Sequence, residues 1–126
     1  DVTTTGVELG ATRHVGATLL RVHYSGLRVD APGLSLLSKY VLEYARHSAG
    51  ISAAAPVGAG VRAALNADYR NRVDGQQYWL IGARLSRTMG KLDAFIEGSN
   101  LLDRSFHEVA GVPMPGRWLS VGLRIF

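Results

Sequence analysis

The feature that most constrains this chain is a strict two-residue alternation of apolar and polar side chains. Between residues 60 and 72, an apolar set (Val61, Ala63, Leu65, Ala67 and Tyr69) alternates with a set that carries the charged and amide groups (Arg62, Ala64, Asn66, Asp68 and Arg70). This period places the two sets on opposite faces of a β-strand, whereas an amphipathic helix repeats every three or four residues. The segment is therefore predicted to be a two-faced strand.

The same alternation recurs along most of the 126 residues. It predicts an all-β antiparallel meander of about seven strands, at residues 6–14, 18–25, 47–55, 60–72, 78–87, 91–100 and 117–126. Most of these segments are near the length of roughly ten residues that a tilted strand needs to cross a bilayer. We therefore expect transmembrane strands that form part of an outer-membrane β-barrel.

The connections support this interpretation because they alternate in length. Short turns are predicted at 14–16, 56–60 and 88–90, and longer connections at 27–45, 71–77 and 101–116. Short turns at one end and long loops at the other are typical of outer-membrane barrels. A soluble β ligand-binding domain has the same period, but its solvent face is richer in Lys and Glu. Here the more apolar face is mainly Ala, Val and Leu, with Tyr24, Tyr69 and Trp79 near strand ends, as in interfacial girdles.

The number of strands predicts that the chain is part of a larger barrel. Single-chain bacterial barrels have an even number of strands, and an open seven-stranded sheet would leave two unpaired edges in lipid. The first residues, 1–5, are interpreted as the approach to a strand already in progress. The alternative is a complete small outer-membrane barrel, structural or hydrolytic, whose eighth strand lies near residues 34–43.

Charge and chemistry exclude several other functions. Twelve of the 14 cationic residues are Arg, and they are scattered from Arg13 to Arg124, so no nucleic-acid partner is expected. The chain has no Cys, and its histidines share no catalytic or metal-binding motif, so we expect no enzyme activity, metal or cofactor. The histidines are interpreted as polar interior or loop residues: His14, His23, His47 and His107.

Two motifs resemble TonB-dependent outer-membrane receptors. The stretch Leu42-Glu43-Tyr44-Ala45-Arg46-His47 is similar to the entry of a downward strand in that family, without its usual proline. A second match is formed by residues 100–106 (NLLDRSF) and 109–117 (VAGVPMPGR). Together they look like the end of the penultimate strand, the last external loop and the start of the final strand in that family. The cobalamin-receptor-like branch fits best. Asn100 and Asp103 can bond backbone groups where the strand ends, and the two prolines stiffen the loop before Gly116 bends it into the last strand.

The resemblance implies that residues 1–126 are the C-terminal segment of a receptor barrel in the outer membrane of a Gram-negative bacterium. Such a receptor takes up a scarce small-molecule ligand, such as a metal chelate or corrinoid. Its partners would be outer-membrane lipid, the remaining strands, a plug domain absent from these residues, and the TonB complex acting through that plug. The polar faces would line a hydrated interior or contact the plug through Glu8, Arg21, Arg62, Asp68, Arg70 and Arg84. Ligand contacts are expected mainly in the connections at 27–45 and 101–116.

The end of the chain departs from the barrel pattern. Outer-membrane chains commonly end in an aromatic residue on the lipid-facing side. Phe126 instead alternates in phase with Arg124 and Ser120, while the apolar phase is Leu119, Val121, Leu123 and Ile125. Phe126 is therefore not assigned as an assembly signal.

Overall fold

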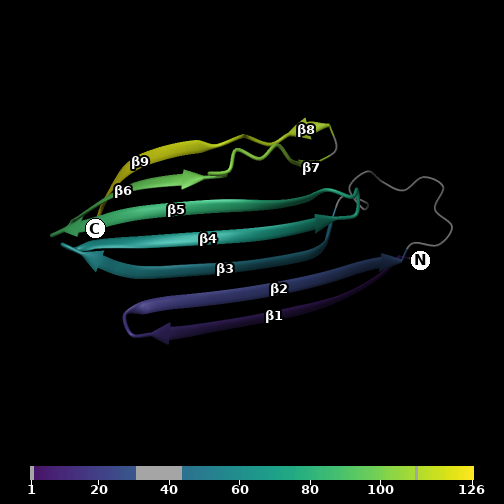
Figure 1. Cartoon of the computed structure of the whole chain (residues 1–126), viewed down its shortest axis with the longest axis horizontal. Helices are drawn as coiled ribbons and strands as arrows, with labels where there is room; N and C mark the ends of the chain where they lie inside the picture. Colours follow the sequence, from purple (N-terminus) through teal and green to yellow (C-terminus); the bar gives the residue numbers. More distant parts are fainter. Residues whose placement is uncertain (1, 31–43, 110) are drawn as a thin grey trace.

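In the computed structural model, the protein is one curved antiparallel sheet with a small hairpin at one end (Figure 1). The structure describes residues 2–30, 44–109 and 111–126. Seven strands pair in the order β1-β2-β3-β4-β5-β6-β9, so the predicted meander is confirmed. The bounds are β1 Thr3–Val15, β2 Thr18–Asp30, β3 Ala45–Gly58, β4 Val61–Arg72, β5 Gln77–Met89, β6 Leu92–Ser99 and β9 Trp118–Ile125. No helix long and apolar enough to span a membrane occurs in the described part of the chain.

The three predicted short turns are two-residue loops of β-hairpins, all at one end of the sheet. They lie at residues 16–17, 59–60 and 90–91, and each contains backbone with positive φ. Gly16, Gly60 and Gly90 adopt this conformation without the steric cost of a side chain, while Ala59 adopts it at φ 50°. The positive φ values match the hairpin twist to the twist of the strands.

Two connections differ from the prediction. Pro56 was expected in a turn, but β3 continues to Gly58 with a register shift between Pro56 and Gly58. Proline is tolerated there because β2 pairs with β3 only as far as Ala54. The connection predicted at 71–77 is shortened to residues 73–76, because β4 runs to Arg72, where the predicted strand 60–72 also ended, and β5 begins at Gln77.

The long connection at 101–116 is confirmed and contains a hairpin that the sequence did not predict. Strands β7 (His107–Val109) and β8 (Val112–Pro113) pair within it, at the end of the sheet opposite the two-residue turns (Figure 1). Residues 31–43 lie outside the described residues. The proposed eighth strand at 34–43, most of the connection at 27–45 and part of the motif at 42–47 therefore fall outside this description.

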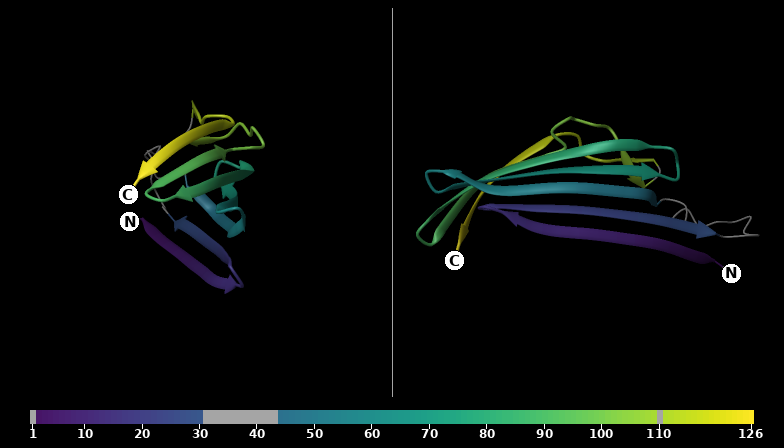
Figure 2. Two further views of the ribbon diagram at one scale, coloured as in Figure 1. Left: turned by 90° about the vertical axis from the view of Figure 1, so that its left-hand side faces the viewer. Right: turned by 60° about the horizontal axis from the view of Figure 1, so that its bottom comes forward.

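The sheet curls into an open trough, with β1 and β9 on its two arms (Figure 2). Neither edge strand has a second neighbour among the described residues. The strand register separates two faces as the alternation predicted. Val22, Ile51, Ala67 and Ile81 lie in one row on the convex face, and Arg21, Ser52, Asn66 and Gly82 lie in the next row on the concave face.

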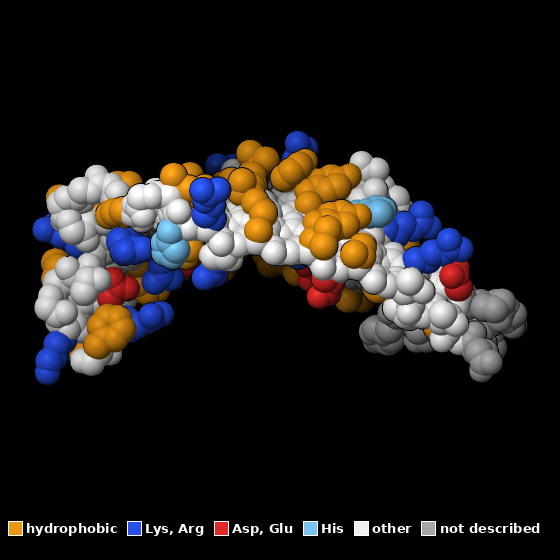
Figure 3. Space-filling model, turned by 90° about the horizontal axis from the view of Figure 1, so that it is seen from below, with side chains coloured by type: hydrophobic (Ala, Val, Ile, Leu, Met, Phe, Trp, Pro, Cys, Tyr) orange, Lys and Arg blue, Asp and Glu red, His pale blue; other side chains and the backbone are white. Residues whose placement is uncertain are grey.

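The convex face is apolar and exposed. Hydrophobic side chains gather over the middle of this arched surface, and Lys and Arg lie mainly toward its ends (Figure 3). Exposed fractions reach 65% at Leu9, 77% at Val121 and 80% at Ile125. Among the described hydrophobic residues, Tyr78 and Phe106 alone are buried. The sheet therefore lacks a hydrophobic core of its own.

The concave face is closely packed where glycine lies beside a larger side chain. Gly10 and Gly50 flank His23 in one cross-strand row. A Cβ atom on Gly10 would lie 3.8 Å from the nearest atom, the carbonyl oxygen of Val22. A Cβ atom on Gly50 would overlap the His23 ring and lie 2.7 Å from Asp68 Oδ1. The His23 ring therefore occupies the space that a side chain at residue 50 would need.

This difference predicts opposite outcomes for two equivalent substitutions. Gly10→Ala should leave stability unchanged or slightly raised, because alanine lowers the entropy of the unfolded chain. Gly50→Ala should lower the free energy of unfolding by about 1 kcal/mol, because the His23 ring must move. Denaturant unfolding followed by tryptophan fluorescence measures both. Equal unfolding midpoints for the two variants would contradict the packing described here.

Candidate functional site

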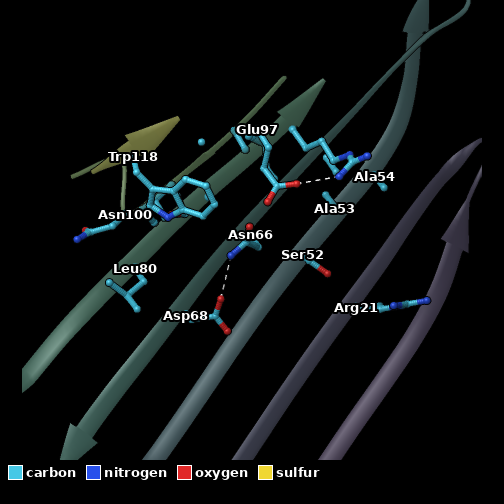
Figure 4. Close-up of a pocket in the computed structure, with 18 of the residues that line it drawn as sticks. Arg21, Ser52, Ala53, Ala54, Asn66, Asp68, Leu80, Glu97, Asn100 and Trp118 are labelled. Carbon is cyan, nitrogen blue, oxygen red and sulfur yellow. Dashed lines mark hydrogen bonds and ion pairs between the residues drawn. The ribbon is translucent and has the colours of Figure 1, made fainter. Parts of the chain in front are cut away.

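The concave face contains a hollow of about 740 Å³ that extends across most of the sheet (Figure 4). Strands β2 to β6 and β9 contribute to its walls, and the connection between β6 and β9 closes one end. Charged, amide and hydroxyl groups share the lining with aromatic and aliphatic side chains. The residues most relevant to ligand contact are Arg21, Ser52, Asn66, Asp68, Arg84, Glu97, Asn100 and Trp118.

Arg84 is fixed by three residues of the neighbouring strand. Its Nη1 donates to Glu97 Oε2 at 2.8 Å, and its Nη2 lies 4.0 Å from Asp93 Oδ2. The Arg84 guanidinium carbon is 3.8 Å from the centre of the Phe95 ring. Residues 93, 95 and 97 share one face of β6, so the strand period itself builds this arrangement. Arg84 is therefore a restrained, charge-compensated part of the wall.

A second cluster of polar side chains joins β2 to β4 across β3. His23 Nε2 lies 3.6 Å from Asp68 Oδ1, and Asn66 Nδ2 donates to Asp68 Oδ2 at 3.0 Å. Gly50 lies between His23 and Asp68 in the strand register and leaves the space that this contact requires. Both carboxylate oxygens of Asp68 therefore have a polar neighbour.

Other groups face the hollow without a polar partner in the described part of the chain. Arg21 of β2 and Ser52 of β3 are neighbours in register and have no hydrogen bond or ion pair among these residues. Trp118 projects toward Asn66 and Glu97 from the opposite side (Figure 4). It is 52% exposed. The wall thus offers a cation, hydroxyl and amide groups, and an aromatic surface.

Asn100 organises the connection that closes the hollow. Its Oδ1 accepts from the Arg104 amide at 2.9 Å, and its Nδ2 donates to the carbonyl oxygens of Arg104 and Pro115 at 2.8 and 3.3 Å. Asp103 Oδ1 accepts from the Arg117 amide at 2.8 Å. The expectation that Asn100 and Asp103 bond backbone groups is confirmed. Both residues have positive φ, a conformation that Asn and Asp tolerate better than most residues.

The chain bends beside Gly116, at Arg117, just before β9, and Gly116 also allows a close contact. A Cβ atom at this position would lie 2.6 Å from Asp103 Oδ1. Glycine therefore allows the Asp103 carboxylate to approach the backbone at the start of β9. Close approach, rather than a positive φ, explains the residue.

The connection is also held by the β4–β5 turn. Arg72 is 7% exposed, and its Nη2 donates to the Glu108 carbonyl oxygen at 2.8 Å. The His107 amide donates to Gln76 Oε1 at 3.2 Å, and the buried rings of Tyr78 and Phe106 lie 4.7 Å apart. These contacts join segments more than 25 residues apart in the sequence.

Asp74 explains why this turn is shorter than predicted. Its Oδ1 accepts from the Gln76 amide at 3.0 Å, and its Oδ2 accepts from Gln76 Nε2 at 2.8 Å. Arg72 Nε lies 3.5 Å from Oδ2. Burial raises the pKa of Asp74, but the Gln76 hydrogen bonds and the Arg72 charge outweigh burial and leave the pKa below its ordinary value. The ionised carboxylate therefore closes the turn.

The predicted polar-face residues lie together on the concave side, but the histidines do not. The strand register places all six polar-face residues on this side: Glu8, Arg21, Arg62, Asp68, Arg70 and Arg84. His47 instead lies on the convex face, where its Nδ1 is 2.7 Å from the Tyr24 hydroxyl, so its assignment as an interior or loop residue was wrong. Trp118 was not predicted to face the hollow, although its opposite phase to Leu119 is visible in the sequence.

The chemistry of the concave face suits binding. No group of three or more His, Cys, Asp or Glu residues able to hold a metal ion occurs among residues 2–30, 44–109 and 111–126. The polar groups are paired with one another or spread across several strands, so they can contact a ligand or another protein surface at several points. Comparisons with known proteins find no matching family, no matching curated protein and no matching solved structure.

The hydrogen bonds of Asn100 predict a specific sensitivity to substitution. Asn100→Asp keeps the shape of the side chain but replaces its amide donor with an acceptor facing two carbonyl oxygens. We expect a loss of about 1–3 kcal/mol in local stability and faster tryptic cleavage at Arg104 and Arg117. Asp103→Asn is the matched control, because it retains the Oδ1 acceptor for the Arg117 amide. Equal cleavage rates in Asn100→Asp and the unaltered protein would show that Asn100 does not hold this connection.

Proposed function

We propose that this chain forms part of the wall of a TonB-dependent receptor in the outer membrane of a Gram-negative bacterium. The observation that carries the membrane assignment is the continuous, exposed apolar convex face. Many of its large aliphatic side chains are about half to four-fifths exposed, including Leu65 at 58% and Leu123 at 70%. Water is a poor solvent for such a surface, whereas lipid chains match it.

The dimensions of this face support contact with a bilayer. Tyr24, Tyr69 and Trp79 lie in one cross-strand row at the edge of the apolar region, with the Tyr69 and Trp79 rings 5.2 Å apart. Along β5, Arg87 follows Trp79 by eight residues on the same face, or about 26 Å at roughly 3.3 Å per residue. This agrees with the apolar band of about 25 Å in outer-membrane barrels, which aromatic residues border.

The open edges support membership in a larger barrel. In lipid, every backbone N–H and C=O group needs a hydrogen-bond partner, and a closed barrel supplies one. β1 and β9 each pair on one side within the described chain. We infer that further strands pair with their free sides, in a barrel with the roughly 22 strands of outer-membrane transporters.

The receptor assignment rests on the resemblance of residues 100–117 to the last external loop of that family. Two features of the fold agree with it: the loop is held by Asn100 and Asp103, and it closes a polar hollow on the concave side. The hollow would face the barrel interior and contact the plug or the ligand. The ligand would be a scarce metal chelate or corrinoid, and transport would require the plug and the TonB complex.

Single cysteines on neighbouring residues of β4 test the membrane assignment, because the chain has no Cys of its own. In intact outer membranes, Leu65→Cys should react with a lipid-soluble maleimide and resist a charged, water-soluble one. Asn66→Cys is the matched control on the concave face and should react with the water-soluble reagent. Rapid labelling of Leu65→Cys by the charged reagent in the folded protein would contradict a lipid-facing convex side.

Uptake measurements test the receptor assignment separately. Deletion of the gene should reduce the uptake of radiolabelled cobalamin or of a labelled ferric chelate at nanomolar concentration. Restoring the gene should restore uptake, and a protonophore should abolish the restored fraction because that fraction depends on energy from the inner membrane. Uptake of both probes that is unaffected by deletion would contradict the receptor assignment while leaving the membrane assignment to the cysteine experiment.

A further inference from the structure

The convex face has a cationic patch next to its apolar region, at the end of the sheet opposite the two-residue turns. Arg28, Arg46 and His47 line a hollow of about 690 Å³ there, together with Tyr24 and Tyr44. Basic side chains lie beside the hydrophobic surface at this end of the sheet, which is on the right in Figure 3. The strand period does not explain this grouping, because Arg46 is the extra residue at an irregularity in β3.

Arg28 presents most of its guanidinium to the surroundings. It lies in β2 on the same face as Val22 and Tyr24 and pairs in register with Thr5. Its side chain is 79% exposed. Its Nε donates to Asp30 Oδ1 at 3.0 Å, and no described residue accepts from its two terminal nitrogens. Asp30 therefore orients the guanidinium and leaves its outer edge available to an anion.

Arg46 reaches the same hollow because the strand is irregular. The register changes from Ala45 opposite Arg72 to His47 opposite Asn71, so Arg46 has no partner in the ladder. Such irregularities redirect a side chain relative to regular alternation. Arg46 is exposed and lines the hollow together with Arg28. Arg28 and Arg46, from different strands, thus face the same hollow. Asp30 is the one acidic residue among those that line it.

The Tyr24–His47 pair supplies a further donor. The Tyr24 hydroxyl lies 2.7 Å from His47 Nδ1, and the rings stack with centroids 6.1 Å apart. When the hydroxyl donates to Nδ1, the neutral His47 ring carries its proton on Nε2. No described residue accepts from Nε2, which can therefore donate to an anion.

We propose that Arg28, Arg46 and His47 form a binding site for the phosphate of an anionic lipid headgroup. This inference rests on the proposed membrane position of the convex face. In that position the patch lies just outside the row of Tyr24 and Trp79, at the depth of lipid phosphates. Arginine binds phosphate through paired N–H donors, and the exposed side chains of Val7 and Leu9 beside the patch would contact the acyl chains. A free anion would use the cations but not these apolar side chains.

Native mass spectrometry of the full-length protein in nonionic detergent tests the site. We expect phosphatidic acid to be retained in preference to phosphatidylcholine of the same chain length. Arg28→Gln combined with Arg46→Gln should reduce this preference about 25-fold, since each cation near an anionic surface contributes about fivefold. The control is Arg62→Gln with Arg124→Gln, which makes the same change in charge on the concave face and should keep the preference.

The outcomes separate this site from its alternatives. A preference unchanged by the Arg28→Gln and Arg46→Gln pair would overturn the proposal, as would equal losses in the control pair. Millimolar inorganic phosphate should not displace phosphatidic acid, and full displacement would indicate a soluble-anion site instead. If Leu65→Cys is protected from water-soluble reagent but the preference does not depend on Arg28 and Arg46, the membrane assignment stands and the headgroup site fails.

Discussion

Backbone hydrogen bonding between neighbouring strands is the interaction on which this structure depends, because the sheet has almost no core. Adjacent strands pair over as many as 13 positions, as between β1 and β2, while two hydrophobic side chains are buried in the described chain. Ladders of this kind remain stable where water does not compete for them and where both edges are paired. The proposed membrane barrel accounts for both the exposed apolar face and the edge strands that pair on one side, because lipid would cover the face and further strands would pair with the edges.

The sequence predicted the phase of each strand better than its ends. The phase, meaning which residues of a strand share a face, follows from the alternation of apolar and polar side chains. This alternation reflects the chemical difference between the two sides of the sheet. Ends depend on local hydrogen bonds that alternation does not record. The Asp74 carboxylate closes the β4–β5 turn by bonding Gln76, so β5 begins at Gln77, one residue before the predicted strand. Pro56 stays in β3 because its missing N–H falls where β2 has ended.

The candidate site was predictable to the extent that it is local. Asn100 and Asp103 bond backbone groups at most 15 residues away, and their residue types indicate that chemistry. The contact from Arg72 to the Glu108 carbonyl spans 36 residues and depends on how β5 and β6 place the two segments. Sequence pattern contains no direct record of such a contact. Trp118 lies between these two cases. The alternation of residues 117–126 predicts which face of the sheet it is on, but not that this face contains the hollow.

The treatment of charge differs between the two faces of the sheet. On the concave face Arg84 is held by Glu97 and Asp68 is held by Asn66, in pairs that need polar surroundings but little bulk water. On the convex face Arg13 and Arg87 lie near the two-residue turns, and neither has an acidic partner among the described residues. Long cationic side chains in such positions can extend their charge toward headgroups while their methylene groups remain in an apolar layer. Ion pairs within the sheet therefore lie mainly on the concave face, although Arg21 there has no such partner among the described residues and Arg28 on the convex face pairs with Asp30. This uneven distribution of paired charge agrees with the proposed position of the sheet between an aqueous interior and a bilayer.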